Sequence, residues 1–154
     1  MEKQRHSDRF LNMVDDATSS VNEINVQELA KKMESKEKFY LVDVREDCEW
    51  QAGRLFNATH IARGRIECDI ESHIPDSKAD IVLYCRGGYR SLLAAAALQK
   101  MGSTRVKSLA GGFAAWVEAG FEYDGHMMDP SEQQKYYETE QNEATIRPKP
   151  WNEE

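Results

Sequence analysis

One cysteine, Cys85, directly follows a short apolar run and precedes a glycine loop with two arginines. The loop reads Cys85-Arg86-Gly87-Gly88-Tyr89-Arg90-Ser91, and Ile81-Val82-Leu83-Tyr84 comes before it. In an open α/β sheet, ligands bind beyond the carboxyl ends of the strands, so a reactive side chain placed here stands where chemistry usually occurs. A cysteine after a strand also suits a small buried core residue. The residues that follow Cys85 decide between the two.

The loop favours a nucleophile. Two adjacent glycines let the chain curl with its N–H groups inward, and the helix predicted to follow directs the positive end of its dipole to the same point. The thiolate is the reactive form of cysteine, and helix N-termini and neighbouring arginines stabilise it. The same cradle would hold the outer sulfur of a persulfide, which is also anionic. We therefore expect Cys85 to accept and pass on a sulfur atom as an enzyme-bound persulfide, without a general base.

The other two cysteines have no such setting. Cys48, Cys68 and Cys85 are separated by 20 and 17 residues, with no C-x-x-C and no histidine at metal-ligand spacing. We therefore predict no disulfide, no metal site and no cofactor, and we assign Cys48 and Cys68 no role. His60 is interpreted as a packing or hydrogen-bonding residue beside a strand.

Predicted strands and helices alternate around this loop. Apolar runs without a helical period predict buried strands at 39–44, 81–84 and 106–109, with a small strand at 59–61. Helical spacing and glycine stops predict helices at 26–35, 46–52, 66–72, 91–101 and 113–119. Asn25 and Glu28 predict a capping box at the first of these helices. The alternation indicates a parallel α/β sheet.

Size and charge exclude several classes of protein. A chain of 154 residues with 40% apolar side chains suits one globular domain, and no stretch approaches the roughly 20 apolar residues that span a bilayer. The first twenty residues lack the apolar core of a secretory signal, so we expect a cytoplasmic location and no membrane contact. The net charge of −7 argues against nucleic acid as a partner.

Four motifs, in this order, make the chain resemble the rhodanese family of sulfurtransferases over roughly residues 24–123. They are Asp43-Val44-Arg45 followed by Glu49-Trp50 and Gly53, then Ala58-Thr59-His60-Ile61, the Cys85 loop, and Leu109-Ala110-Gly111-Gly112-Phe113-Ala114-Ala115-Trp116. The resemblance implies a rhodanese-like α/β domain at residues 24–125, with a central parallel five-stranded sheet flanked by helices on both faces. The chain departs from the family's usual Gly-His-Ile-Pro-Gly-Ala, where it reads Gly53-Arg54-Leu55-Phe56-Asn57-Ala58.

The resemblance also implies roles for individual residues. Cys85 matches the persulfide-forming cysteine, and the substrate-binding residues would be Arg86, Gly87, Gly88, Tyr89, Arg90 and Ser91. Arg86 and Arg90 would hold the anionic donor, while Asp43 and Arg45 would tie neighbouring segments together near the loop. The implied activity is that of a thiosulfate:cyanide-type sulfurtransferase, which moves sulfane sulfur from an anionic donor such as thiosulfate to a thiophilic acceptor: cyanide, a thiol or a protein.

Two rival functions stay open at this point. Cysteine-dependent phosphatases and arsenate reductases also use a cysteine in an anion-binding loop that ends in arginine. Their loops place one residue more between the two than the four that separate Cys85 from Arg90, so the present loop suits a smaller group. A sulfur-carrier or regulatory module, which serves only a docked protein, is the other alternative.

Two segments flank the predicted domain. Residues 1–23 are interpreted as an N-terminal arm, in which Phe10, Leu11 and Val14 permit a short helix. Residues 126–154 form an acidic extension that we expect to be peripheral. It is either a solvated tail or a docking segment, and it would allow a homodimer if it packs across a second copy through Tyr136, Tyr137, Ile146 and Trp151.

Overall fold

A sheet of five parallel strands forms the centre of the protein. The structure, a computed structural model, describes residues 6–125. The strands lie in the order β1-β6-β5-β2-β4, and every neighbouring pair is parallel. Their bounds are β1 Asn22–Ile24, β2 Tyr40–Asp43, β4 Thr59–His60, β5 Asp80–Tyr84 and β6 Arg105–Leu109. The predicted α/β class with a five-stranded parallel sheet is confirmed.

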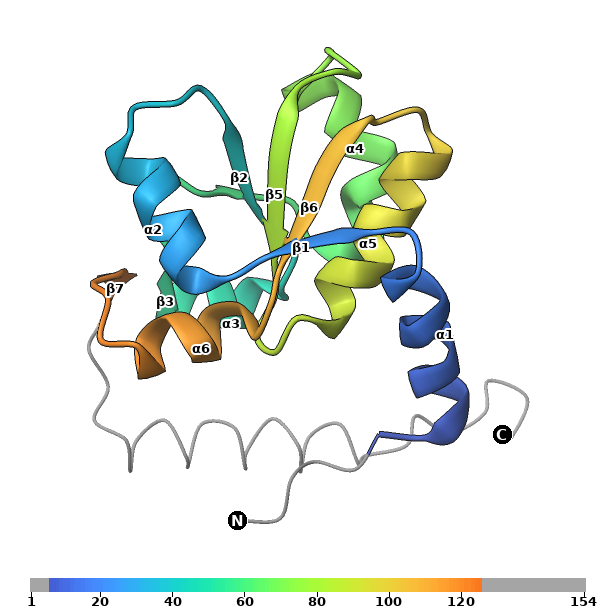
Figure 1. The fold of residues 1–154 in the computed structure, drawn as a ribbon, viewed down its shortest axis with the longest axis horizontal. Helices are drawn as coiled ribbons and strands as arrows, with labels where there is room; N and C mark the ends of the chain where they lie inside the picture. The colour runs from blue at the N-terminus through green and yellow to red at the C-terminus, as the bar shows by residue number, and fades with distance from the viewer. Residues whose placement is uncertain (1–5, 126–154) are drawn as a thin grey trace, which may run out of the picture.

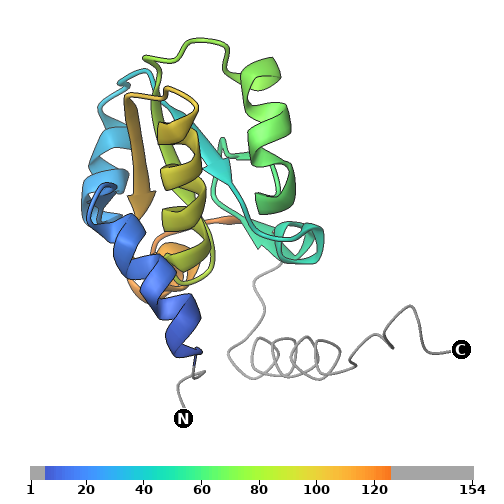
Figure 2. The ribbon, with the colours of Figure 1, turned by 90° about the vertical axis from the view of Figure 1, so that its right-hand side faces the viewer.

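Helices cover both faces of this sheet (Figures 1 and 2). One face carries α1 (Asp8–Thr18), α4 (Ile66–His73) and α5 (Tyr89–Lys100), and the other carries α2 (Val26–Glu34) and α6 (Gly112–Glu118). Successive side chains of a strand point to opposite faces, so Leu83 and Cys85 belong to the first core and Val82 and Tyr84 to the second. Strand β5 is buried along its whole length, and it delivers Cys85 to the carboxyl edge of the sheet.

Short elements complete the surroundings of that edge. Helix α3 (Asp47–Ala52) follows β2, and the 3-10 helix η1 (Arg63–Arg65) follows β4. Strand β3 (Gly53–Arg54) pairs antiparallel with β7 (Asp124–Gly125) in a separate two-stranded sheet.

The predicted elements mostly stand where the sequence put them. The Asn25–Glu28 capping box of α2 is present. Helix α5 begins two residues earlier than predicted, because Gly88 takes the N-cap position with a left-handed φ of 101°. The strand patterns accounted for four of the five strands of the central sheet and missed β1. It is a three-residue edge strand with polar residues at its first two positions, so it carries little of the apolar signal of a buried strand.

The acidic extension predicted at 126–154 lies outside the described residues, as do the packing residues Tyr136, Tyr137, Ile146 and Trp151. Within residues 6–125, no helix is long and apolar enough to cross a membrane. Over the same range, no group of three or more His, Cys, Asp or Glu side chains is placed to hold a metal ion.

Candidate active site at the end of strand β5

The sulfur of Cys85 lies in a buried, polar setting. Only 1% of the residue is exposed. The backbone N–H of Gly88 donates a hydrogen bond to Sγ at 3.1 Å, and the Ser91 hydroxyl lies 3.4 Å from the same atom. An N–H donor aimed at sulfur stabilises its anionic form. The structure therefore brings together three of the predicted site residues: the cysteine, a loop glycine and the serine of the first turn of α5.

A chain of buried hydroxyl groups connects this sulfur to the neighbouring strand. Ser91 Oγ contacts the carbonyl oxygen of Gly88 at 3.2 Å and lies 2.7 Å from Ser108 Oγ on β6. Both serines are fully buried. Buried polar groups that satisfy one another fix a single arrangement of the segments that carry them, so the chain holds the loop in register with the sheet.

Helix α6 holds the loop from behind through two backbone hydrogen bonds. The N–H of Phe113 donates to the carbonyl of Cys85 at 2.8 Å, and the N–H of Ala114 donates to the carbonyl of Arg86 at 3.0 Å. This close approach requires glycine at 112, because a Cβ there would overlap both carbonyl oxygens, and Gly112 has a φ of 58°. The carbonyls of Cys85 and Arg86 are thus turned toward α6.

Asp43 and Arg45 form a buried ion pair beside the loop. The guanidinium contacts the carboxylate at 2.8 Å and donates to the carbonyl of Gly53 at 2.6 Å. It also lies 4.3 Å from the centre of the Phe113 ring. Burial opposes the charge of Arg45, but Asp43 outweighs it and raises the pKa of the guanidinium above its ordinary value. The pair ties β2, β3 and α6 together, which supports the predicted role of these two residues.

Arg90 is held by a carboxylate for which the sequence predicted no role. Its two terminal nitrogens contact the two oxygens of Glu49 on α3, at 2.6 and 3.0 Å. Only 5% of Glu49 is exposed. Burial opposes its charge, but the Arg90 guanidinium outweighs burial and lowers the pKa of the carboxyl below its ordinary value. The arginine that ends the loop is therefore half of a two-point ion pair.

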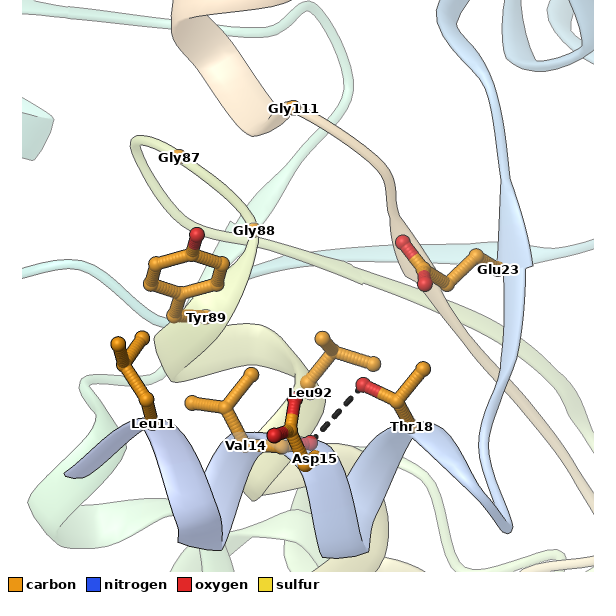
Figure 3. A pocket seen from close by; sticks show the side chains of 10 residues that line it. All are labelled: Leu11, Val14, Asp15, Thr18, Glu23, Gly87, Gly88, Tyr89, Leu92 and Gly111. Carbon is orange, nitrogen blue, oxygen red and sulfur yellow. Dashed lines mark hydrogen bonds between the residues drawn. The ribbon is translucent and has the colours of Figure 1, made fainter. Parts of the chain in front are cut away.

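The N-terminal helix flanks the loop on another side. Figure 3 shows a pocket between α1 and the glycines of the loop. The volume of this pocket is about 220 Å³. Tyr89 lines it, and its ring centre lies 6.1 Å from that of Phe10 and 5.2 Å from that of His6. Val14 and Ala17 of α1 enter the core that contains Cys85. The segment interpreted as an arm thus contains a helix packed against the domain and the loop.

The remaining predicted residues have backbone or peripheral positions. Gly87 lines the same pocket, and Arg86 offers its carbonyl to α6. The imidazole of His60 donates a hydrogen bond from Nε2 to the carbonyl oxygen of Arg45, 2.8 Å away, and stacks on Trp50, in line with the packing role predicted for it. Cys48 and Cys68 are exposed and form no disulfide within residues 6–125.

Sequence reasoning missed the roles of Glu49, Ser108 and Gly112. Glu49 and Gly112 stood within recognised motifs, but partners distant in sequence define what they do. Ser108 had a weak local signal, since it is a small polar residue near the carboxyl end of a buried strand. Its pairing across β5 and β6 places it opposite Leu83, two residues before the cysteine.

A buried cysteine stands at the end of the central strand of a parallel sheet, with a backbone N–H at its sulfur, and this arrangement defines a class of α/β domains that carry a thiol in a loop at the carboxyl edge of the sheet. Within that class, the chain belongs to the rhodanese-like domain family, whose model matches residues 25–119. The resemblance inferred from the motifs is confirmed.

Curated relatives support sulfur transfer as the general activity. A sulfurtransferase of Allochromatium vinosum is 37% identical over 100 residues, covering 65% of this chain and 92% of the relative. A putative sulfurtransferase of Bacillus subtilis is 36% identical over 96 residues, covering 62% and 90%. The domain is therefore a transferase, and its partners are donors and acceptors of sulfur.

Solved structures share the fold. A Rhodopseudomonas palustris protein, described as of unknown function and a possible tyrosine phosphatase, has a TM-score of 0.68 and 30% identity, covering 80% of this chain and all of that one. The polysulfide-sulfur transferase homodimer of Wolinella succinogenes has a TM-score of 0.67 and 23% identity, covering 79% and 91%. At 23% identity, the likeness to the Wolinella succinogenes protein shows a shared fold alone.

Proposed function

We propose that the domain transfers sulfane sulfur from an anionic donor such as thiosulfate, through a persulfide on Cys85, to cyanide or a thiol. The Cys85 thiolate attacks the outer sulfur of thiosulfate, a new S–S bond forms, and sulfite leaves with the electron pair of the bond that breaks. The observation that carries this proposal is the Gly88 N–H at 3.1 Å from Sγ. A donor in that position stabilises an anionic sulfur before and after transfer.

The second half-reaction returns the thiolate. Cyanide attacks the outer sulfur of the persulfide, a C–S bond forms, and thiocyanate leaves while the electron pair of the S–S bond returns to Cys85 Sγ. A thiol acceptor reacts in the same way as its thiolate, after losing its proton to solvent, and leaves as a persulfide that carries the transferred sulfur. No step needs a base from the protein, because the attacking groups act as anions.

Two observations favour sulfur over phosphate as the transferred group. The loop has four residues between Cys85 and Arg90, and both terminal nitrogens of Arg90 are engaged by Glu49. A phosphatase needs its loop arginine for the phosphate oxygens, whose charge grows in the transition state. Hydrolysis of a phosphate ester is therefore the poorer explanation of this site.

A protein acceptor is a second candidate, which the relatives favour. A putative sulfur carrier protein of Bacillus subtilis is 29% identical over 99 residues, covering 64% of this chain and 52% of that protein. In this version the persulfide is the same, but a docked protein takes the sulfur. A persulfide that forms from thiosulfate and is discharged poorly by cyanide, but fast by a protein thiol, would favour it.

The test of the proposed function is substitution of the three cysteines. Cys85→Ser should abolish thiocyanate formation from thiosulfate and cyanide, because serine offers no sulfur to carry the persulfide. Cys48→Ser and Cys68→Ser, at exposed positions, are the matched controls and should keep the wild-type rate. Activity that survives Cys85→Ser would contradict the assignment.

A further inference from the structure

The ion pair between Arg90 and Glu49 is both two-point and largely buried. It is a two-point contact, with each terminal nitrogen of the guanidinium on its own carboxylate oxygen at 2.6 and 3.0 Å. The side chain of Glu49 is 5% exposed and that of Arg90 is 30% exposed. The carboxylate is therefore almost wholly buried, and water reaches the pair mainly through the partly exposed guanidinium.

The Arg90 guanidinium interacts electrostatically with the sulfur of Cys85. The negative charge of a Cys85 thiolate and that of Glu49 both raise the pKa of the Arg90 guanidinium, against the opposing effect of burial. A donor that approaches Cys85 thus meets a guanidinium whose positive charge is already compensated by one negative charge. The pair acts on that donor as a dipole, which attracts an anion less than a free arginine does.

We propose that Glu49 determines which donors the site accepts: by neutralising Arg90, it disfavours dianionic donors such as thiosulfate relative to donors with a single negative charge. The proposal rests on the sulfurtransferase activity proposed above and adds the charge of the donor to it. Glu49 is a positioning residue in this role, because it acts on the donor through Arg90.

The size of the effect follows from Coulomb's law. For this estimate we take a donor anion on the exposed side of the guanidinium to lie roughly 6–8 Å from the Glu49 carboxylate. At that separation, and with an effective dielectric constant of about 20–40, removal of one charge changes the interaction with each donor charge by on the order of tenfold in affinity. A dianion gains this factor twice and a monoanion once, so their ratio should change by about tenfold.

The experiment compares two donors that carry the same sulfane sulfur. Thiosulfate is a dianion, whereas methanethiosulfonate has a methyl group in place of one charged oxygen. The kcat/KM of each donor is measured with cyanide as acceptor, for the wild type, Glu49→Gln and Asp47→Asn. Gln keeps the shape of Glu49 and its capping position on α3. Asp47 is the matched control, since it is on the same helix but its side chain is 83% exposed.

Glu49→Gln should raise the ratio of kcat/KM for thiosulfate over methanethiosulfonate about tenfold, and Asp47→Asn should leave it unchanged. Arg90→Gln should lower the ratio, because it leaves the buried carboxylate uncompensated. The double variant Arg90→Gln/Glu49→Gln restores a neutral pair and should return the ratio toward the wild-type value.

Two results would overturn the proposal. One is an unchanged ratio in Glu49→Gln together with wild-type transfer from both donors. The other is a double variant that keeps the ratio of Arg90→Gln, which would make Arg90 a direct ligand of the donor. Failure of the proposed function itself is distinguishable, because the wild type would then form no thiocyanate from either donor. If Glu49→Gln alone folds poorly, the ratio is compared between Arg90→Gln and the double variant, which leaves no uncompensated charge in the pair.

Discussion

Replacement of Gly112 by alanine tests how the loop is held. The new Cβ would overlap the carbonyl oxygens of Cys85 and Arg86, and φ at 112 is +58°. The left-handed conformation costs a non-glycine residue roughly 1–2 kcal/mol. Moving α6 to relieve the overlap breaks two hydrogen bonds, those of Phe113 and Ala114, at about 1 kcal/mol each. Gly112→Ala should therefore lower the free energy of unfolding by about 3–4 kcal/mol.

Gly120→Ala is the matched control for this substitution. Gly120 has a φ of +82°, and a Cβ there would meet nothing within 4 Å, so this variant should lose only the conformational part, roughly 1–2 kcal/mol. Both variants stiffen the unfolded chain equally, and this effect cancels in the comparison. Urea unfolding gives the two free energies, and the thiocyanate assay should show a fall in kcat/KM on the order of a hundredfold for Gly112→Ala alone. Equal stability and activity of the two variants would refute the account of α6.

Three further predictions concern the sulfur, the far end of the sheet and the N-terminal helix. Ser91→Ala should cost roughly 1–2 kcal/mol of stability and lower kcat/KM for thiosulfate, and an unchanged kcat/KM would remove its hydroxyl from the site. Asp80 is buried, which opposes its charge, but three cations around its carboxylate outweigh burial and lower its pKa below 3.8. Its contribution to stability is therefore present above pH 3.8 and lost as the pH falls through the lower folded pKa. Asp80→Asn should flatten the dependence of the unfolding free energy on pH in that window, and an unchanged slope in urea titrations would contradict this. Phe10→Ala should lower the free energy of unfolding by roughly 1 kcal/mol, because the contact with Tyr89 is lost. It should also reduce the protection of the Cys85 loop in hydrogen exchange. Protection equal to that of the wild type would show that α1 does not stabilise the loop.

The fold was largely predictable because its signals are local. Apolar runs marked the buried strands, and the capping box at Asn25 and the glycine after α5 marked helix ends. Strand β1 could not be predicted in this way, since pairing with β6 defines it and its own residues are mostly polar. The extent of α1 packing was equally hidden, because Val14 and Ala17 become core residues only when α5 supplies their partners.

The site was predictable only in part, for a related reason. Cys85, Gly88 and Ser91 lie within seven residues of one another, so their meeting at one sulfur follows from a single loop of the chain. Arg90 was expected to face the donor, yet its partner Glu49 lies 41 residues away. No local pattern distinguishes a loop arginine that is free from one that is paired, because tertiary packing makes the difference.

Intact-mass analysis after incubation with thiosulfate tests the central claim most directly. The protein should gain one sulfur atom, located at Cys85 by peptide mapping, and cyanide should remove it with release of thiocyanate. Cys85→Ser should gain none. The absence of this adduct on the wild type, or its appearance on Cys48 or Cys68 instead of Cys85, would contradict the account.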